Sequence, residues 1–180
     1  MILKINADLE LHQIKMTDAP DVFNTIDTQR AYLGKWLPFV EFTKELKDTE
    51  SFIQSELGIP DGKMEYIFTI RKQGKFIGLI TIKGTDSLNQ KTEIGYWLSE
   101  KEQGQGIMTK AVDRLCDFVF NELKLNRIQI NCAEGNEPSF KIPERLGFTF
   151  EGIQREGNLL PGGIFAGSRV YSLLKSEYKK

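Results

Sequence analysis

Hydrophobic and polar residues alternate along several short stretches of this chain. The alternation in residues 9–14, 65–83 and 91–98 predicts β-strands, because successive side chains of a strand point to opposite faces. Gln73 and Gly74 interrupt the second stretch with a turn, so 65–83 is predicted to be a hairpin. Three later hydrophobic stretches predict further strands at 127–133, 148–156 and 168–175.

Other stretches have hydrophobic residues three or four positions apart, the period of a helix. The clearest follows Gly106 and extends to about Leu123, and shorter helices are predicted at 17–28, 47–57 and 137–147. Strands come first and then alternate with helices, which predicts a mixed α/β fold with a central sheet and antiparallel N-terminal strands. We expect residues 1–180 to form one domain, since a chain of 180 residues can bury a sizeable core.

Two glycines stand directly before the clearest helix. Gly104 and Gly106 can leave backbone N–H groups exposed at the positive end of the helix dipole, which is a favourable site for a phosphate. Thr109 and Lys110 in the first turn would add a hydroxyl and a cation. The plain alternative is a tight strand-to-helix turn, and the glycines alone leave both interpretations open. A dinucleotide fingerprint does not fit, because Thr109 occupies the place of its third glycine.

Composition narrows the function classes. The net charge of −1 gives no electrostatic reason to expect a nucleic-acid partner. The longest apolar runs are shorter than the roughly 18 residues of a membrane span, and residues 1–10 lack a secretory signal, so we expect a cytoplasmic protein. With His12 as the single histidine and two separate cysteines, we expect no metal site.

Two segments together resemble a known family. The segment EIGYWLSEKEQGQGIMTKAV (93–112) resembles the acyl-CoA-binding motif of the GNAT acetyltransferases, and NEPSFKIPERLGFTFEG (136–152) resembles the motif that follows it. The chain is most similar to the RimJ/RimL branch, which acetylates the N-termini of bacterial ribosomal proteins. That branch shares IGYWL, GQGI, the pattern from Cys132 to Ser139, and a segment like YLGKWLPF at 32–39.

The resemblance implies a GNAT fold, acetyl-CoA as acetyl donor and a possible homodimer. It also implies that the glycine loop holds the pyrophosphate of CoA, while strand 91–98 separates from its neighbour and offers free N–H groups to the pantetheine arm. The residues that it assigns to the donor are Trp97, Leu98, Gln103, Gly104, Gln105, Gly106, Ile107, Met108, Thr109, Asn136 and Ser139.

The sequence departs from the family pattern in three places. Met108 replaces a glycine or alanine of the general motif, although the RimJ/RimL branch usually has a bulky residue there. Pro143 stands where many members have a catalytic tyrosine, which directs attention to Ser139 as the group that protonates the leaving thiolate. The segment GGIFAGSRV (162–170) lacks the His and Asp that relatives often have before the last strand.

Glu93 and Ser139 are the candidate catalytic residues. Glu93 is predicted to lie near the acetyl site, on the strand face shared with Gly95 and Trp97, where it could remove the proton of the amine. A solvated or ion-paired glutamate and an ordinary serine at a helix N-terminus are the plain alternatives. Cys132, in an apolar strand, is better explained as a core residue than as a nucleophile.

The acceptor amine is constrained by its acidity. Deprotonation at pH 7 costs about 1–1.4 kcal/mol for an α-amino group and about 4.6 kcal/mol for a lysine, at pKa values of about 7.7–8.0 and 10.4. The sequence shows no strong base, so a protein N-terminus is favoured. Tyr32, Trp36 and Phe39 are predicted to line its groove, facing a flexible, glycine-rich loop at 158–167.

Two other functions stay open at this point. The same chemistry could act on a small amine such as a polyamine, an amino sugar or an antibiotic. A catalytically silent CoA-binding sensor is the alternative of a different class, and the altered loop at 162–168 keeps it open.

Overall fold

One mixed β-sheet organises the part of the chain that the computed structural model describes, residues 1–179, with the backbone alone for Asp61. Lys180, the last residue of the expected domain, lies outside the described residues. The eight strands of this sheet follow the order β1-β2-β3-β4-β5-β6-β8-β7. Their bounds are Ile2–Lys4 (β1), Leu9–Gln13 (β2), Tyr66–Lys72 (β3), Lys75–Asp86 (β4), Lys91–Leu98 (β5), Arg127–Ala133 (β6), Thr149–Leu160 (β7) and Ile164–Leu174 (β8).

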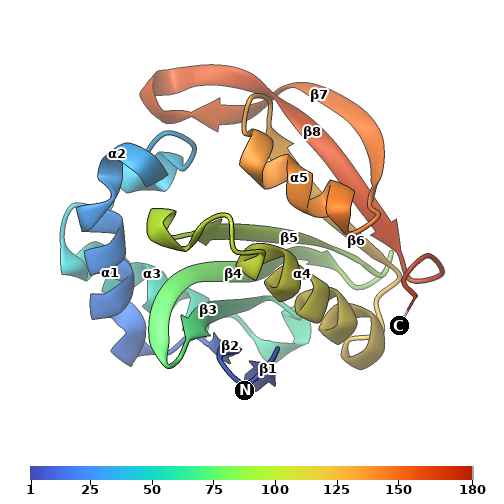
Figure 1. The fold of residues 1–180 in the computed structure, drawn as a ribbon, viewed down its shortest axis with the longest axis horizontal. Coiled ribbons are helices and arrows are strands. Elements are labelled where there is room, and N and C mark those ends of the chain that lie inside the picture. The colour runs from blue at the N-terminus through green and yellow to red at the C-terminus, as the bar shows by residue number, and fades with distance from the viewer. Residues whose placement is uncertain (180) are drawn as a thin grey trace.

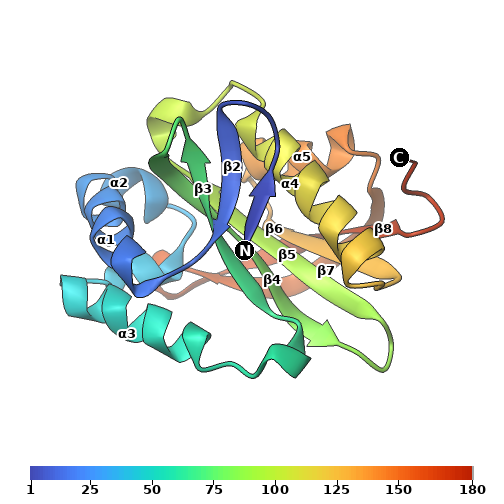
Figure 2. The same cartoon turned by 90° about the horizontal axis from the view of Figure 1, so that it is seen from below.

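Helices cover both faces of the sheet, and each face has its own hydrophobic core (Figures 1 and 2). The helices are Ala19–Thr28 (α1), Arg30–Leu33 (α2), Leu46–Leu57 (α3), Ile107–Asp117 (α4) and Glu137–Arg145 (α5). The larger core lies under α4 and α5, where Ala111, Val112 and Leu115 are fully buried. The second core joins α1 and α3 to Trp97 on the opposite face. The predicted mixed α/β architecture with antiparallel N-terminal strands is confirmed.

The sheet opens between β5 and β6. These two strands are parallel, and they pair only at their beginnings, from Lys91 opposite Arg127 to Glu93 opposite Gln129. Beyond that point β5 continues to pair with β4, from Ile94 to Leu98, while β6 pairs with β8. The two strands therefore diverge, and the wedge between them leaves one edge of β5 without a strand partner.

Three segments differ from the sequence-based expectation. A short strand, β1, precedes the first predicted strand and pairs with it. The aromatic segment 30–42 forms α2 and a 3₁₀ helix at Pro38–Glu41, because Gly34 and Pro38 divide it into short pieces. The predicted flexible loop at 158–167 is instead the tip of the β7–β8 hairpin, with only Pro161–Gly163 between the strands.

The reason for the wrong loop prediction is visible at Gly167. A Cβ at this position would collide with the carboxylate of Glu134 and approach Ile153 Cγ2 to 2.9 Å. Gly167 therefore permits close packing of the hairpin against the end of β6, and does not make the chain mobile.

Candidate active site

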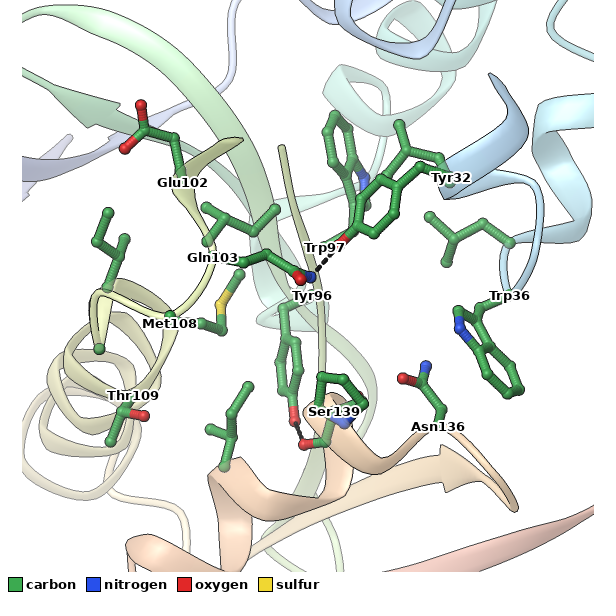
Figure 3. A pocket seen from close by; sticks show the side chains of 18 of the residues that line it. Tyr32, Trp36, Tyr96, Trp97, Glu102, Gln103, Met108, Thr109, Asn136 and Ser139 are labelled. Carbon is green, nitrogen blue, oxygen red and sulfur yellow. Dashed lines mark hydrogen bonds between the residues drawn. The ribbon is translucent and has the colours of Figure 1, made fainter. Parts of the chain in front are cut away.

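A cavity of about 890 Å³ lies where β5 and β6 diverge, with α4 on one side and α5 on the other (Figure 3). Its walls come from the segment around α2, the end of β5, the glycine loop and the first turns of α4 and α5. The lining residues are Tyr32, Leu33, Lys35, Trp36, Leu37, Tyr96, Trp97, Leu98, Glu102, Gln103, Gly104, Gly106, Ile107, Met108, Thr109, Lys110, Gly135, Asn136, Pro138, Ser139, Ile142 and Arg145. Most of the residues predicted for the donor and acceptor meet here.

The glycine loop presents the N-terminus of α4 to this cavity. Gly104 and Gly106 have positive φ angles of 73° and 69°, and a Cβ on either would meet nothing within 4 Å. Gly106 occupies the N-cap position, and no side chain caps the helix. The first N–H groups of α4 are thus available to an anion in the open space beside the loop.

Three cationic side chains border the same cavity: Lys35, whose ammonium lies over the Trp36 ring, and Lys110 and Arg145. Lys110 extends from α4 and Arg145 from α5, and neither forms an ion pair with another described residue. An uncapped helix N-terminus between unpaired cations suits the negative charges of a phosphorylated ligand.

Tyr96 stands between α4 and α5 in the middle of the cavity (Figure 3). Its hydroxyl donates a hydrogen bond of 2.9 Å to the backbone carbonyl of Ser139. The Ser139 hydroxyl lies 3.4 Å from the Cys132 thiol, so β5, β6 and α5 meet at these three residues. Burial raises the pKa of the Tyr96 hydroxyl and that of the Cys132 thiol, which keeps both groups protonated near neutral pH. Cys132 is buried, as the sequence indicated, but its contact with Ser139 was not foreseen.

The free edge of β5 offers backbone groups to the cavity. The amide of Ser99 donates to the carbonyl of Ile77 at 2.8 Å. With the register of β4 and β5, this bond shows which residues of β5 direct their amides toward β4. In this register the amide of Trp97 points toward β4, whereas the amides of Tyr96 and Leu98 point toward the opening. This strand geometry agrees with the prediction for Leu98, whereas for Trp97 the neighbouring amide of Tyr96 takes its place. The Trp97 indole lies in the opposite core, against Phe76.

The aromatic wall is formed by Tyr32 and Trp36. The Tyr32 hydroxyl accepts a hydrogen bond from the side-chain amide of Gln103, which joins α2 to the glycine loop across the cavity (Figure 3). Burial raises the pKa of Tyr32, and the nearby Glu100 carboxylate raises it further. Phe39 does not line the cavity, because the 3₁₀ helix at Pro38–Glu41 turns its ring outward to 39% exposure.

Glu93 and Gln105 also lie outside the lining. Glu93 is placed where β5 and β6 are still paired, and strand alternation turns it to the face opposite Tyr96 and Ser139. There its carboxylate pairs with Lys83 Nζ at 3.0 Å and accepts a hydrogen bond from Asn131 at 2.8 Å. The space expected above Gly95 is taken by Thr81 and Lys83. Gln105 turns outward, because its side-chain carbonyl accepts a hydrogen bond from Lys72 at 2.8 Å.

The hairpin tip closes one side of this region. The amide of Gly162 donates to the Glu41 carboxylate at 3.0 Å, so the two segments expected to frame an acceptor entrance are in direct contact. The cavity wall of Tyr32 and Trp36 lies outside this contact.

Tyr96 and Arg145 are among the cavity residues that the sequence analysis missed, together with Leu33, Lys35, Leu37, Glu102, Gly135, Pro138 and Ile142. Alternation along β5 already placed Tyr96 on the face of Ile94 and Leu98, but its hydroxyl contact depends on how close α5 packs. Arg145 ends a predicted helix, and no sequence pattern indicated which side of that helix faces the cavity.

The side chains that the structure describes include no group of three or more His, Cys, Asp and Glu that could hold a metal ion. Within residues 1–179, none of the helices combines the length and the hydrophobicity that crossing a membrane requires.

Comparisons with known proteins agree with the geometry. A family model described as the acetyltransferase (GNAT) domain matches residues 8–149. The chain is 35% identical over 182 residues to YdaF of Bacillus subtilis (strain 168), whose name assigns it provisionally to the ribosomal N-acetyltransferases; the match covers 98% of this chain and 96% of that protein. It is 29% identical over 158 residues to a ribosomal-protein-serine acetyltransferase of Escherichia coli (strain K12), with 88% of each chain covered.

The fold has a close match among solved structures. A structure of RimL, a ribosomal L7/L12 alpha-N-protein acetyltransferase in complex with coenzyme A, superposes with a TM-score of 0.92 over 97% of this chain and 98% of that chain. At 23% identity this likeness shows the shared fold alone.

Proposed function

Because this chain belongs to the GNAT family of N-acetyltransferases, we propose that it transfers the acetyl group of acetyl-CoA to the N-terminal α-amino group of a protein, with ribosomal proteins as the favoured acceptors. The observation that carries the proposal is the continuous cavity from the N-terminus of α4 to the aromatic wall of Tyr32 and Trp36. The names of the relatives in Bacillus subtilis and Escherichia coli support a ribosomal acceptor.

The donor fits the wedge between β5 and β6. The N–H groups at the start of α4, with Lys110 and Arg145, would hold the phosphates of CoA. The free amides of Tyr96 and Leu98 would bind the amide-bearing pantetheine arm, as an additional strand would. Asn136, at the N-cap position of α5, lines the same side of the cavity and would contact this arm.

Acetyl-CoA supplies an activated acetyl group as a thioester. Transfer breaks the C–S bond, forms a C–N bond, removes one proton from the amine and returns one to the sulfur. We assign the proton for the sulfur to the Ser139 hydroxyl, which lines the cavity beside Tyr96. Removal of the amine proton is assigned to Glu93 through water; Glu93 is the last β5 residue that pairs with β6, on the sheet face opposite Ser139.

The remaining expectations belong to the same proposal. A ribosomal acceptor would place the protein in the cytoplasm. A homodimer is supported by the position of β7 at the sheet edge, where Ile153 and Leu159 are 46% and 52% exposed. The single sheet supports one domain over residues 1–180.

The test is a screen of acceptors with purified protein and acetyl-CoA. Peptides with different N-terminal residues, single amino acids, spermidine and an aminoglycoside are compared by thiol release, and mass spectrometry locates the acetyl group. We expect N-terminal peptides to be the best acceptors, with acetylation on the α-amine. Faster turnover of spermidine or the aminoglycoside than of every peptide would contradict the proposal. Binding of acetyl-CoA without transfer to any acceptor would favour a sensor.

A further inference from the structure

Pro143 lies inside α5, where it changes the hydrogen bonding of the first turn. In a regular α-helix the amide of residue 143 would donate to the carbonyl of Ser139, four residues earlier. Proline has no amide hydrogen, so this carbonyl loses its helical partner. Ser139, whose carbonyl loses this hydrogen bond, is also the candidate proton donor of the reaction.

The Tyr96 hydroxyl takes the place of the missing amide. It donates to the Ser139 carbonyl at 2.9 Å, across the gap between β5 and α5 (Figure 3). The Ser139 hydroxyl is held separately, 3.4 Å from the Cys132 thiol on β6. Ser139 is thus fixed from two sides, and the fixed point joins the end of the open strand to the helix that faces it.

We propose that Tyr96 is a positioning residue that holds Ser139 in the active site, in a role that Pro143 makes necessary. The proposal rests on the proposed acetyl transfer, because Ser139 matters for turnover only if it serves that reaction. Pro143 stands where many family members have a tyrosine, so the hydroxyl of that tyrosine is absent. The hydroxyl of Tyr96 contacts the same helix from β5.

Tyr96→Phe removes the hydroxyl and keeps the ring in the cavity. We expect kcat to fall about 10- to 100-fold, the range that a small displacement of a reacting group produces, with KM for acetyl-CoA changed less than about threefold. Tm should fall by several degrees, because a partly buried carbonyl loses its partner.

The decisive variant is the pair Tyr96→Phe and Pro143→Ala. Alanine restores the amide that bonds the Ser139 carbonyl, so the second substitution should recover most of the loss in kcat and in Tm. Pro143→Ala alone should stay close to wild type, since the carbonyl oxygen can accept two hydrogen bonds. Tyr32→Phe is the matched control: its hydroxyl contacts Gln103 and not α5, so Pro143→Ala should not restore any loss it causes.

Each outcome decides the proposal. Wild-type kcat in Tyr96→Phe, or a loss that Pro143→Ala leaves unchanged in a folded double variant, would overturn it. Loss in Tyr96→Phe of a basic limb that wild type shows in its pH profile would overturn it too, since Tyr96 would then be a proton donor itself. The Tm cycle needs no acceptor, so failure of the wild-type protein to transfer acetyl groups would refute the proposed function without deciding the coupling between Tyr96 and Pro143.

Discussion

The indole of Trp36 lies against Gly135, and a Cβ on Gly135 would stand 3.4 Å from Trp36 Cη2. This contact connects the segment after α2 with the loop between β6 and α5, across the cavity that both segments line. Trp36 therefore forms the wall beside the point where α5 begins, away from the glycine loop at the start of α4.

The first prediction concerns this wall. Trp36→Ala should raise KM for a peptide acceptor about tenfold, a loss of about 1.4 kcal/mol, because an apolar surface for the first side chain disappears. KM for acetyl-CoA should change less than about threefold. Steady-state kinetics with both substrates measure the split. Trp36→Phe, which keeps a ring, should have a KM for the peptide between those of wild type and Trp36→Ala. Equal effects on KM for the peptide and for acetyl-CoA would contradict a place for Trp36 in the acceptor site.

The second prediction tests the phosphate role of Gly106. Its φ of 69° is unfavourable for a β-branched residue, so Gly106→Val would lower stability as well as binding. Asparagine tolerates this conformation, and its side chain would enter the open space beside the loop. We expect Gly106→Asn to weaken acetyl-CoA binding at least tenfold, measured by calorimetry, with a Tm change of only about 2–4 °C per kcal/mol of strain.

Gly74→Asn is the matched control for this substitution. Gly74 has a φ of 78° and open space around its Cβ position, but it lies in the β3–β4 turn and does not line the cavity. It should show the same small change in Tm and no change in binding. Equal binding by both variants and wild type would support a plain turn at Gly106.

A third prediction addresses the hydroxyl of Ser139. Ser139→Ala should lower kcat at least tenfold and leave KM for acetyl-CoA within about threefold, because the hydroxyl acts during departure of the thiolate. Ser139→Thr keeps a hydroxyl and should retain more activity than alanine. Unchanged kcat in the alanine variant would show that the thiolate receives its proton from elsewhere.

Glu93 gives a fourth prediction, read from the pH profile of kcat. If its carboxylate removes the amine proton through water, Glu93→Gln should lower kcat at neutral pH and flatten the acidic limb. Lys83→Met serves as control, since it removes the ion-pair partner at 3.0 Å but keeps the carboxylate. An acidic limb that survives in Glu93→Gln would assign Glu93 to the ion pair alone.

The fifth prediction concerns stability in acid. Arg127 contacts both carboxylate oxygens of Glu151 at 2.7 Å, and Ser172 donates to one of them at 2.7 Å. These hydrogen bonds, first those of Arg127, lower the pKa of Glu151 from 4.5 to about 2. Because the folded pKa is lowered, the stabilisation is complete above pH 4.5 and disappears as the pH falls toward 2.

The measurement is Tm against pH for wild type and Glu151→Gln. The difference between them should be constant above pH 4.5 and shrink toward pH 2. Glu156→Gln, on the same strand but without an ion pair among the described residues, should follow wild type throughout. A difference that does not depend on pH would show that the pair stabilises only through packing.

Much of this architecture follows from local sequence. Strand alternation and helical period placed the elements from β2 to α5, because each pattern reports which side of one element faces the core. Gly104 and Gly106 marked the start of α4 for a local reason as well, since the backbone there needs positive φ angles. Local sequence therefore located the glycine loop before any contact was known, whereas its role as a phosphate site stays a prediction.

Tertiary structure decided what local patterns do not contain. Glu93 and Tyr96 lie on the same strand but on opposite faces of the sheet. Glu93 contacts Lys83, whereas Tyr96 contacts Ser139. The sequence predicted a loop at 158–167, where the structure has a hairpin. Glycine is needed at 167 because Glu134, a residue more than thirty positions away, leaves no space for a Cβ. A proline at 143 removes one helical hydrogen bond, and its replacement by the Tyr96 hydroxyl depends on the distance between β5 and α5, which only packing sets.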